Sequence, residues 1–381
     1  IAIDTGASAI KVVASLAGDE KCVPFTIDPF CVDLDDLHQS DRIPDPNLNF
    51  DHRSVWVGIG SKYYAVGTLA KSKYGICPSI TPLKSDSIVP KIVAAIAVAA
   101  QKFNLSSKFN LSIFAVLPPG EYIYSTNVSA GLTMALRKIS TPAGKITPIL
   151  QKISIYPEGY GILNWHRIYG AATEQDIGVI MFGYRNTSVL FSEGGEVTGL
   201  KSCNLGFNNV LEQISSLSGG GYDENDLARP VWNYLINENE SGFRNLSRSK
   251  NYQLESSMIK NAIEKALIDY RLKLKNWLTT AMRQTNMIVT CGGNAEYIGN
   301  SFDSFLEAYA QHFEGRGCII IQHIGSTSIP NEITETGMAV RYLDIYCLWL
   351  ELSCSLKKEV INKFDKAKKL HLANWSNITR D

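Results

Sequence analysis

The sequence predicts an α/β protein that contains one structural unit twice. The chain opens with IAIDTGASAIKVVASLAG, where apolar, β-branched stretches flank a bend of small residues, a pattern typical of two strands joined by a tight turn. The segment IMFGYRNTSV repeats the pattern of IDTGASAIKV 177 residues later, with Gly183 in the turn position of Gly6. Helical segments follow each hairpin. Such self-similarity indicates a duplicated unit.

Length and composition agree with a globular protein of this size. The chain has 381 residues, enough for two domains or one large domain. Of these residues 45% are hydrophobic and 19% are charged. The 37 Lys and Arg residues balance the 37 Asp and Glu residues, so the whole fold offers no field that would attract a polyanion. Direct, strong nucleic-acid binding is therefore disfavoured.

The first unit continues with a mixture of strands and one buried helix. Residues 24–53 are rich in Asp, Pro and Asn, which predicts a surface loop or hairpin. SVWVGIGSKYYAVGTLA alternates around Gly60 and Ser61 and predicts a second hairpin. We expect a buried helix over residues 88–103 and a buried strand in LSIFAVLPPGEY, ending at Pro118.

The second unit is expected to repeat the order of strands before helices. KISIYPEGYGIL predicts a strand that stops at Pro157, and EQDIGVIMFGYRNTSVLFSEGGEVTGLKSCNLG predicts three strands. An apolar stripe predicts a helix over residues 254–278, and NMIVTCGGNAEYIG a strand that runs into a glycine pair and a helix. Segments 336–353 and 355–370 are expected to be helical, the second of them basic.

The predicted location is cytoplasmic. The eight cysteines never form a C-x-x-C pair, which favours scattered thiols in a reducing compartment. The most apolar run, residues 88–100, is shorter than the roughly 20 residues of a membrane span. No charged leader with an apolar core opens the chain. Because a strand is already under way at Ile1, we expect further residues to precede it.

The first candidate binding element is the turn of the opening hairpin, because the common phosphate, dinucleotide, zinc and nucleophile motifs are absent. Consecutive backbone N–H groups in a turn of small residues can surround a phosphate without any side chain. A carboxylate there would hold Mg²⁺ through water, and a lysine would neutralise phosphate charge. The alternative is an exposed turn with a capping Asp. The residues concerned are Asp4, Thr5, Gly6, Ala7, Ser8 and Lys11.

Three further segments are candidates of the same kind. The matching turn of the second hairpin contains Gly183, Tyr184, Arg185 and Asn186. At Gly292, Gly293 and Asn294 the missing side chains would let a base or ribose approach the backbone, although a plain strand-to-helix bend explains the glycines equally well. Glu158, at the end of a strand, could orient or deprotonate a water, or could simply be solvated.

Taken in order, these segments resemble the actin-like ATPase superfamily, and within it the ParM/StbA plasmid-segregation actins. DTGASAIK is similar to the first phosphate loop of that family, VLPPGEY to a strand ending, and SIYPEGYGIL to the segment that links the domains. LKSCNLGFNNVLEQI resembles its strand-to-helix entry, MIVTCGGNAEYIG its adenosine-binding turn, and ITETGMAVRYLDIY its closing helix. The likeness extends from the first residue to about residue 345.

The resemblance implies an actin-like fold, in which two ribonuclease-H-like lobes enclose ATP (or GTP) and Mg²⁺ in a cleft. The implied domain I spans residues 1–155 and 331–381, and domain II spans 156–330. The implied roles are phosphate and metal binding for the first turn, with Asp4 on the metal side, positioning of the attacking water for Glu158, and adenosine contact for the glycine pair with Asn294.

One departure from the family pattern affects catalysis. The second phosphate loop of the family normally begins with Asp, but Met181 stands there in this chain, which removes half of the acidic frame for metal and water. Arg185 adds a cation where the family has a small polar residue, and it could contact phosphate or face solvent. ATP binding is therefore better supported than ATP hydrolysis, which we expect to be slow.

The resemblance favours a filament-forming cytoskeletal protein that assembles with itself and segregates a plasmid, or acts as a scaffold. Contact with DNA would then pass through a DNA-binding adaptor protein. One alternative is a small-molecule kinase of the same superfamily. Another is a membrane-associated scaffold, since SLKKEVINKFDKAKKL is basic and amphipathic, although the same segment could be a C-terminal helix packed on the first lobe.

Overall fold

We describe the protein from a computed structural model. The described residues are 1–36, 50–52, 54–75, 83–169, 176–219, 221–247, 251–295, 297–298, 306, 320–323, 330–336 and 338–357.

The first half of the chain forms a nine-stranded sheet in the order β3-β2-β1-β7-β9-β8-β5-β6-β4. The strands are β1 (Ala2–Thr5), β2 (Ile10–Ala14), β3 (Val23–Ile27), β4 (Cys31–Asp33), β5 (Ser54–Ile59), β6 (Lys62–Gly67), β7 (Lys108–Leu117), β8 (Ile139–Thr141) and β9 (Gly144–Pro157). The Pro- and Asp-rich segment 24–53 therefore contributes parts of two strands, β3 and β4, and residues 37–49 lie outside the described ranges. We call this sheet and its helices the first lobe.

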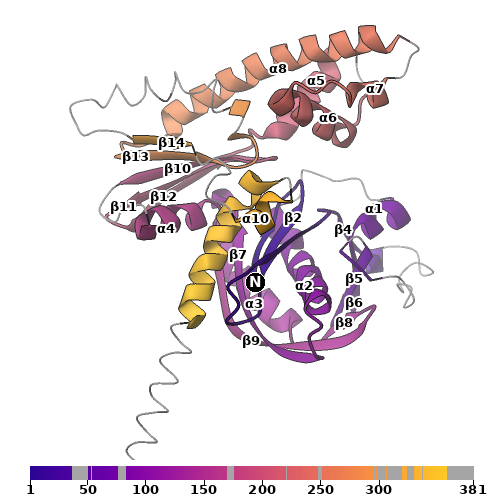
Figure 1. The fold of residues 1–381 in the computed structure, drawn as a ribbon, viewed down its shortest axis with the longest axis vertical. Helices are drawn as coiled ribbons and strands as arrows, with labels where there is room; N and C mark the ends of the chain where they lie inside the picture. The colour runs from indigo at the N-terminus through magenta and orange to yellow at the C-terminus, as the bar shows by residue number, and fades with distance from the viewer. Residues whose placement is uncertain are drawn as a thin grey trace, which may run out of the picture.

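The second half forms a five-stranded sheet in the order β12-β11-β10-β13-β14. Its strands are β10 (Ile177–Phe182), β11 (Thr187–Glu193), β12 (Glu196–Cys203), β13 (Met287–Cys291) and β14 (Ile320–His323). We call this sheet and its helices the second lobe. Figure 1 shows the two lobes one above the other.

The two sheets contain the same hairpin in the same register, which confirms the predicted duplication. In the first lobe Asp4 pairs with Lys11 across β1 and β2, and β1 runs parallel to β7. In the second lobe Met181 pairs with Ser188 across β10 and β11, and β10 runs parallel to β13. Both pairs therefore occupy equivalent positions, near the end of a strand that lies between its hairpin partner and a parallel neighbour.

Helices in the first lobe cover the sheet because their apolar residues face it. The lobe contains α1 (Thr68–Tyr74), α2 (Lys84–Lys102) and α3 (Ser125–Ala135), with short 3-10 turns η1 (Leu34–Asp36) and η2 (Pro119–Tyr124). The run from Ile92 to Ala100 is buried throughout, so the predicted helix is confirmed. It begins one turn earlier than expected, at Lys84, because Asp86 in the first turn accepts the backbone N–H of Leu83 (3.1 Å).

Helices in the second lobe are dominated by α8 (Tyr252–Ala281), which lies along the outer side of the lobe beside α5 (Phe207–Leu217), α6 (Glu224–Asn237) and α7 (Phe243–Leu246) (Figure 1). The predicted apolar stripe of α8 is confirmed by the burial of Ile259, Ile263 and Tyr270 in the core of this lobe.

A third buried cluster joins the lobes. It contains apolar residues of β1 and β10 together with α4 (Tyr160–Tyr169) and α10 (Asn331–Thr334). It also contains a helix over residues 339–357, which covers most of the predicted helical segment 336–353 and continues into the segment predicted over 355–370. This helix and α4 cross in direct contact, because a Cβ built on Gly161 would lie 2.1 Å from the backbone oxygen of Asp344. Residues 358–381, which include most of the basic amphipathic segment, lie outside the described ranges.

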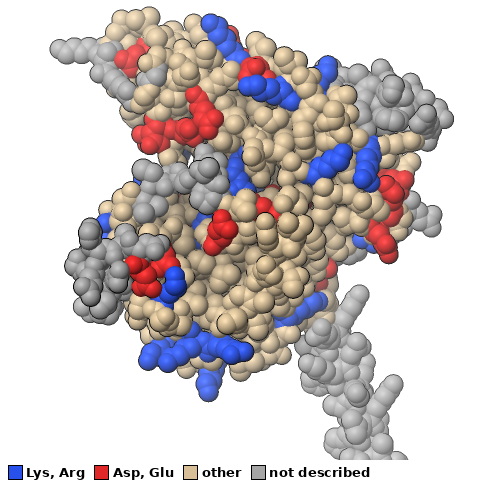
Figure 2. All heavy atoms as spheres, turned by 180° about the vertical axis from the view of Figure 1, so that it is seen from behind, with Lys and Arg blue, Asp and Glu red and all other residues tan. Residues whose placement is uncertain are grey.

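The described surface agrees with the balanced charge of the sequence. On the face in Figure 2, Lys and Arg are interspersed with Asp and Glu and separated by uncharged areas. No helix within the described ranges combines the length and apolarity that crossing a membrane would require.

Candidate functional site

A cavity of about 1030 Å³ lies between the lobes, and both hairpin turns line it. This volume is at the upper end of the range for ligand pockets. The sequence-predicted residues that line it are Asp4, Thr5, Gly6, Ala7, Ser8, Lys11, Glu158, Gly183, Tyr184, Arg185, Asn186 and Gly292. Gly293 and Asn294 do not line it. The structure thus brings together most of the predicted candidates, although they are spread over nearly 300 positions in the sequence.

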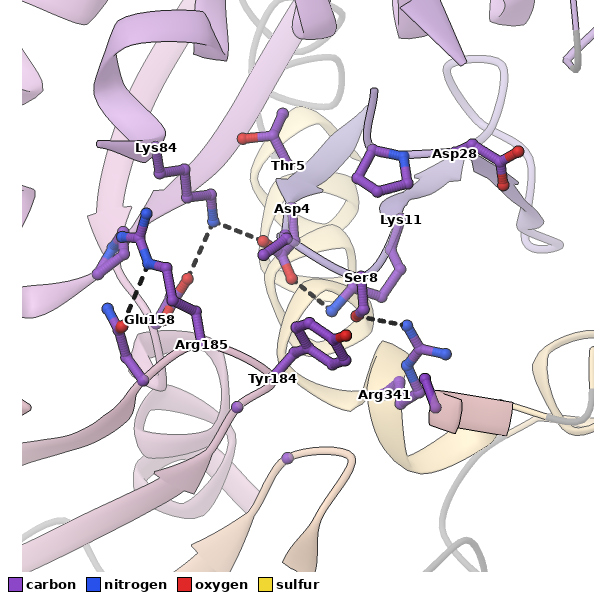
Figure 3. Close-up of a pocket in the computed structure, with 18 of the residues that line it drawn as sticks. Asp4, Thr5, Ser8, Lys11, Asp28, Lys84, Glu158, Tyr184, Arg185 and Arg341 are labelled. Atoms are coloured by element: carbon purple, nitrogen blue, oxygen red, sulfur yellow. Dashed lines mark hydrogen bonds and ion pairs between the residues drawn. The ribbon is translucent and has the colours of Figure 1, made fainter. Parts of the chain in front are cut away.

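Asp4 is surrounded by two lysines (Figure 3). Its Oδ2 lies 2.5 Å from the Nζ of Lys11, and its Oδ1 lies 2.5 Å from the Nζ of Lys84. Burial alone would raise the pKa of Asp4, but the two ammonium groups outweigh burial and hold this pKa well below its ordinary value. Asp4 is therefore an ionised carboxylate, and each of its two oxygens contacts an ammonium group.

Lys84 also contacts the predicted water-orienting residue. Its Nζ lies 2.9 Å from Oε1 of Glu158, so one ammonium group bridges two carboxylates. Lys84 is only 8% exposed. Burial would lower the pKa of Lys84, but Asp4 and Glu158 outweigh burial and hold it above the ordinary value.

Sequence reasoning missed Lys84, although a signal was present. Asp86 marks the start of α2, which places Lys84 in the first helical turn. A cation there is disfavoured by the helix dipole, so its presence points to a carboxylate partner elsewhere in the fold.

The turn of the second hairpin is closed by backbone hydrogen bonds. The N–H of Gly183 donates to the carbonyl of Asn186 (2.9 Å), and the N–H of Asn208 at the start of α5 donates to the carbonyl of Tyr184 (3.0 Å). Asn294 donates from Nδ2 to the carbonyl of Gly183 (2.7 Å). Asn294 thus holds this turn in place from behind, instead of facing the cavity.

The glycine pair after β13 allows close packing inside the protein, because neighbouring atoms occupy the space that its side chains would need. Gly292 has a φ of +96°, and a Cβ built there would lie 2.5 Å from the carbonyl oxygen of Phe182. A Cβ on Gly293 would lie 2.8 Å from Cγ of Arg341. Gly293 therefore leaves room for an arginine side chain, while Gly292 faces the cavity.

Arg185 reaches across the cavity to the first lobe. Its guanidinium forms an ion pair with Glu121 of η2, a residue that also accepts the backbone N–H of Ser85 (2.8 Å). Burial would raise the pKa of Glu121, but these donors outweigh it and lower this pKa. The sequence offered phosphate or solvent as surroundings for Arg185, and the structure shows a carboxylate that sequence reasoning missed.

Arg341, on helix 339–357, is a further cation at the cavity that sequence reasoning missed. Its Nη2 donates to Oγ of Ser8 (2.7 Å), as Figure 3 shows. Burial lowers the pKa of Arg341, but a guanidinium titrates so high that it stays charged. The first turn is therefore flanked by the three cationic groups Lys11, Lys84 and Arg341.

Carboxylates gather on the side of the cavity that α5 and α6 form. Glu212 of α5, Asp223 at the N-cap of α6 and Glu224 beside it all line the cavity. Burial, followed by the charges of Glu212 and Asp223, raises the pKa of Glu224. The cavity therefore has cations around the first turn and acidic groups near α6.

The residues present do not fit the water-mediated Mg²⁺ contact implied for Asp4, because both of its oxygens already contact ammonium groups. Met181 lines the cavity at the position of the second expected carboxylate, and a thioether is a weak acceptor without charge. Among the described residues, no group of three or more His, Cys, Asp or Glu side chains is arranged to hold a metal ion.

Comparisons with known proteins find similarity in structure alone. No protein-family model and no curated protein sequence matches the chain. The actin-like protein Alp7A is 14% identical, with a TM-score of 0.62, over 97% of this chain and 98% of that chain. Ta0583, an archaeal actin homolog, is 13% identical, with a TM-score of 0.55, over 94% of this chain and 98% of that chain.

The ParM protein of Bacillus thuringiensis, solved with ATP, is 14% identical, with a TM-score of 0.53, over 92% of this chain and 98% of that chain. Each likeness covers nearly all of both chains, although few residues are shared. The expectation from the sequence is confirmed, because the chain has the two-lobed actin-like fold.

Proposed function

We propose that this chain is a nucleotide-binding, filament-forming actin-like protein that acts in plasmid or other DNA segregation, or as a cytoskeletal scaffold. The observation that carries the proposal is the cavity between the lobes, which both hairpin turns and Glu158 line. A structurally similar ParM has been solved with ATP, which supports a nucleotide as the ligand.

The distribution of charge sets the orientation of the nucleotide. The phosphates would lie at the first turn, where backbone N–H groups are joined by Lys11, Lys84 and Arg341. The ribose hydroxyls would donate to carboxylates on the side of α5 and α6, where Glu224 is half-buried and Glu212 and Asp223 are exposed. A base would then approach Gly292, and either ATP or GTP satisfies this arrangement.

Glu158 is the proposed catalytic residue, because it lines the cavity beside the first turn and could orient an attacking water. Glu158→Gln should leave nucleotide affinity within about threefold and should slow phosphate release by about 10²-fold or more, since the lost carboxylate acts on the transition state. The measurements are calorimetric binding and phosphate release per protomer. Glu193→Gln, at an exposed carboxylate on β11, is the matched control.

Equal turnover in Glu158→Gln and the parent would leave Glu158 as a structural partner of Lys84. Hydrolysis should be slow even in the parent, because Met181 provides no second carboxylate. No part of this proposal requires a bound metal ion.

Assembly is the second half of the proposal, and sedimentation and light scattering with and without nucleotide test it. Nucleotide-dependent polymers are expected, because many weak contacts along a filament add to a stable whole. The balanced charge of the chain favours a DNA-binding adaptor over direct contact with a plasmid. If no nucleotide causes assembly and a small-molecule acceptor accelerates turnover, the kinase alternative replaces this one. Nucleotide-independent binding to acidic vesicles would favour the membrane-associated scaffold.

A further inference from the structure

The strongest unexplained feature of the cavity is the lysine between two carboxylates. The Nζ of Lys84 lies 2.5 Å from Oδ1 of Asp4 and 2.9 Å from Oε1 of Glu158. These are the two carboxylates to which the family resemblance gives the metal and the attacking water. Figure 3 shows the ammonium group pointing between them.

We propose that Lys84 takes the place of a divalent cation in this cavity, so that the chain binds a nucleoside triphosphate without requiring Mg²⁺. This inference rests on the proposed function, because it concerns how the same cavity receives phosphate. It goes further by naming the group that supplies the positive charge.

The burial of Lys84 is the first argument. Its side chain is 6% exposed, and lysines are almost never so buried unless they are paired. Removing an ammonium from water costs several kcal/mol in such an environment. A lysine that served only to hold helix α2 against the sheet could be replaced by an apolar residue at lower cost. The position lines the cavity, where a bound polyanion would compensate the same charge.

The arrangement of charges is the second argument. Asp4 and Glu158 are balanced by Lys11 and Lys84, and Arg341 adds a further positive charge at Ser8. A hydrated Mg²⁺ could reach Asp4 only by displacing an ammonium group, and it would be repelled by the remaining cations. A triphosphate, in contrast, would be attracted by the net positive charge that Arg341 adds, and it could accept hydrogen bonds from the two ammonium groups.

The other side of the cleft is the third argument. At Met181 a carboxylate would provide a second anchor for a hydrated cation, but a thioether adds no charge. Lys84 on one side of the cavity and Met181 on the other have the same effect. Both make the site less suited to a divalent cation and more suited to a triphosphate that carries no metal ion.

The test is calorimetric titration of the purified chain with ATP, once with Mg²⁺ and once with a metal chelator. For the parent, the two dissociation constants should agree within about threefold. In the chelator, Lys84→Met should weaken binding by about 10- to 100-fold, because charge-assisted hydrogen bonds to phosphate are lost. Mg²⁺ should restore part of that loss, since Asp4 and Glu158 become available. Lys84→Arg should retain binding in the chelator.

Lys102→Met, at the exposed end of the same helix, is the matched control and should behave as the parent does. Circular dichroism checks that each variant is folded, and the measurement on the parent needs no variant. If the chelator weakens binding by the parent more than about thirtyfold, this inference is overturned while the nucleotide site stands. It is also overturned if Lys84→Met binds as the parent does in the chelator. No binding of ATP or GTP under either condition would instead overturn the proposed function.

Discussion

The two hairpin turns occupy equivalent positions in their sheets but are stabilised differently. In the first, a Cβ on Gly6 would lie 3.2 Å from the carbonyl oxygen of Ala9, whereas in the second the same construction on Gly183 lies 2.7 Å from that of Asn186. The N–H of Gly183 donates to Asn186, and within the described part of the chain no matching bond joins Gly6 to Ala9. The first turn is the more open of the two.

The ion pairs of the two turns also differ, because one lies within a lobe and the other joins the two lobes. The carboxylate of Asp4 is held by lysines of its own lobe, whereas the guanidinium of Arg185 is paired with Glu121 of the opposite lobe. An open turn with cations beside it is suited to receive an anion, and a closed turn with a paired cation is suited to hold the lobes together. The two hairpins thus share one backbone arrangement, but their side chains make different contacts.

The largest expected asymmetry is between Asp4 and Met181, which occupy equivalent positions in β1 and β10. Asp4→Ala removes the carboxylate that Lys11 contacts and leaves Lys84 with Glu158 alone, so it should lower the free energy of unfolding by about 3–5 kcal/mol. Met181→Ala removes only part of a half-buried apolar side chain and should cost about 1 kcal/mol. Urea unfolding of both variants measures the difference. Equal costs would mean that the lysines do not depend on Asp4.

Asp344, a buried carboxyl group near the first turn, should make the free energy of unfolding depend on pH. Burial raises the pKa of Asp344 to about 6, and the nearby charges of Asp4 and Glu158 contribute, although the N–H groups of Gly159 and Ile162 donate to it. Between its ordinary pKa and 6, the unfolded chain loses this proton while the folded chain keeps it. The contribution of Asp344 to the stability of the parent therefore falls as pH rises through this window and then levels off.

Asp344→Asn removes this titration. Relative to the parent, the variant should gain up to about 3 kcal/mol of unfolding free energy as pH rises through the window, as measured by urea unfolding at several pH values. Asp226→Asn, at an exposed carboxylate of α6, serves as the control. Parallel pH curves for the parent and Asp344→Asn would contradict the assignment.

The difference in tightness between the turns predicts a third asymmetry. Gly183→Ala forces a methyl group against the backbone of Asn186 and should cost about 1–3 kcal/mol. Gly6→Ala meets looser surroundings and should cost less than about 1 kcal/mol. Thermal unfolding of the two variants provides the comparison, and a larger loss for Gly6→Ala would show that the first turn is the tighter one.

The substitution with the smallest expected effect places a carboxylate in β10 at the position equivalent to Asp4. Met181→Asp introduces the missing carboxylate, so Mg²⁺ should begin to strengthen ATP binding, and phosphate release should rise about tenfold. Because Arg185 is already paired with Glu121, the single substitution suffices. Met181→Asn, which adds polarity without charge, is the control. Turnover in the parent equal to that of Met181→Asp would show that another residue replaces the missing carboxylate.

The sequence predicted what depends on local pattern. The hairpins and the apolar stripe of α8 follow from alternation and helical spacing, and both were confirmed. Asp4 and Gly183 line the cavity, and their binding roles stay predictions. The missed groups depend on contacts between distant segments. Lys84 meets Asp4 across 80 positions and Arg341 meets Ser8 across 333, and neither distance leaves a periodic signal.

The glycine pair shows two readings that the sequence alone could not separate. A G-G-N bend after a strand is compatible with ligand approach and equally with close packing, because both require a missing side chain. The structure places Gly293 against Arg341, and Asn294 behind the second turn. Only the neighbours in space distinguish the two cases.

The contact between Gly161 and the backbone of Asp344 has a mechanical consequence. Two helices that touch at a glycine have a fixed separation at that point, but their angle is not fixed by the contact itself. The crossing is therefore the point about which a rotation of one lobe against the other would take place. Polar contacts also join the lobes, because Arg185 pairs with Glu121 and the N–H of Gly120 donates to Ser202 (3.1 Å). A polyanion that competes with Glu121 for Arg185 would therefore weaken one of the contacts that hold the lobes in this orientation.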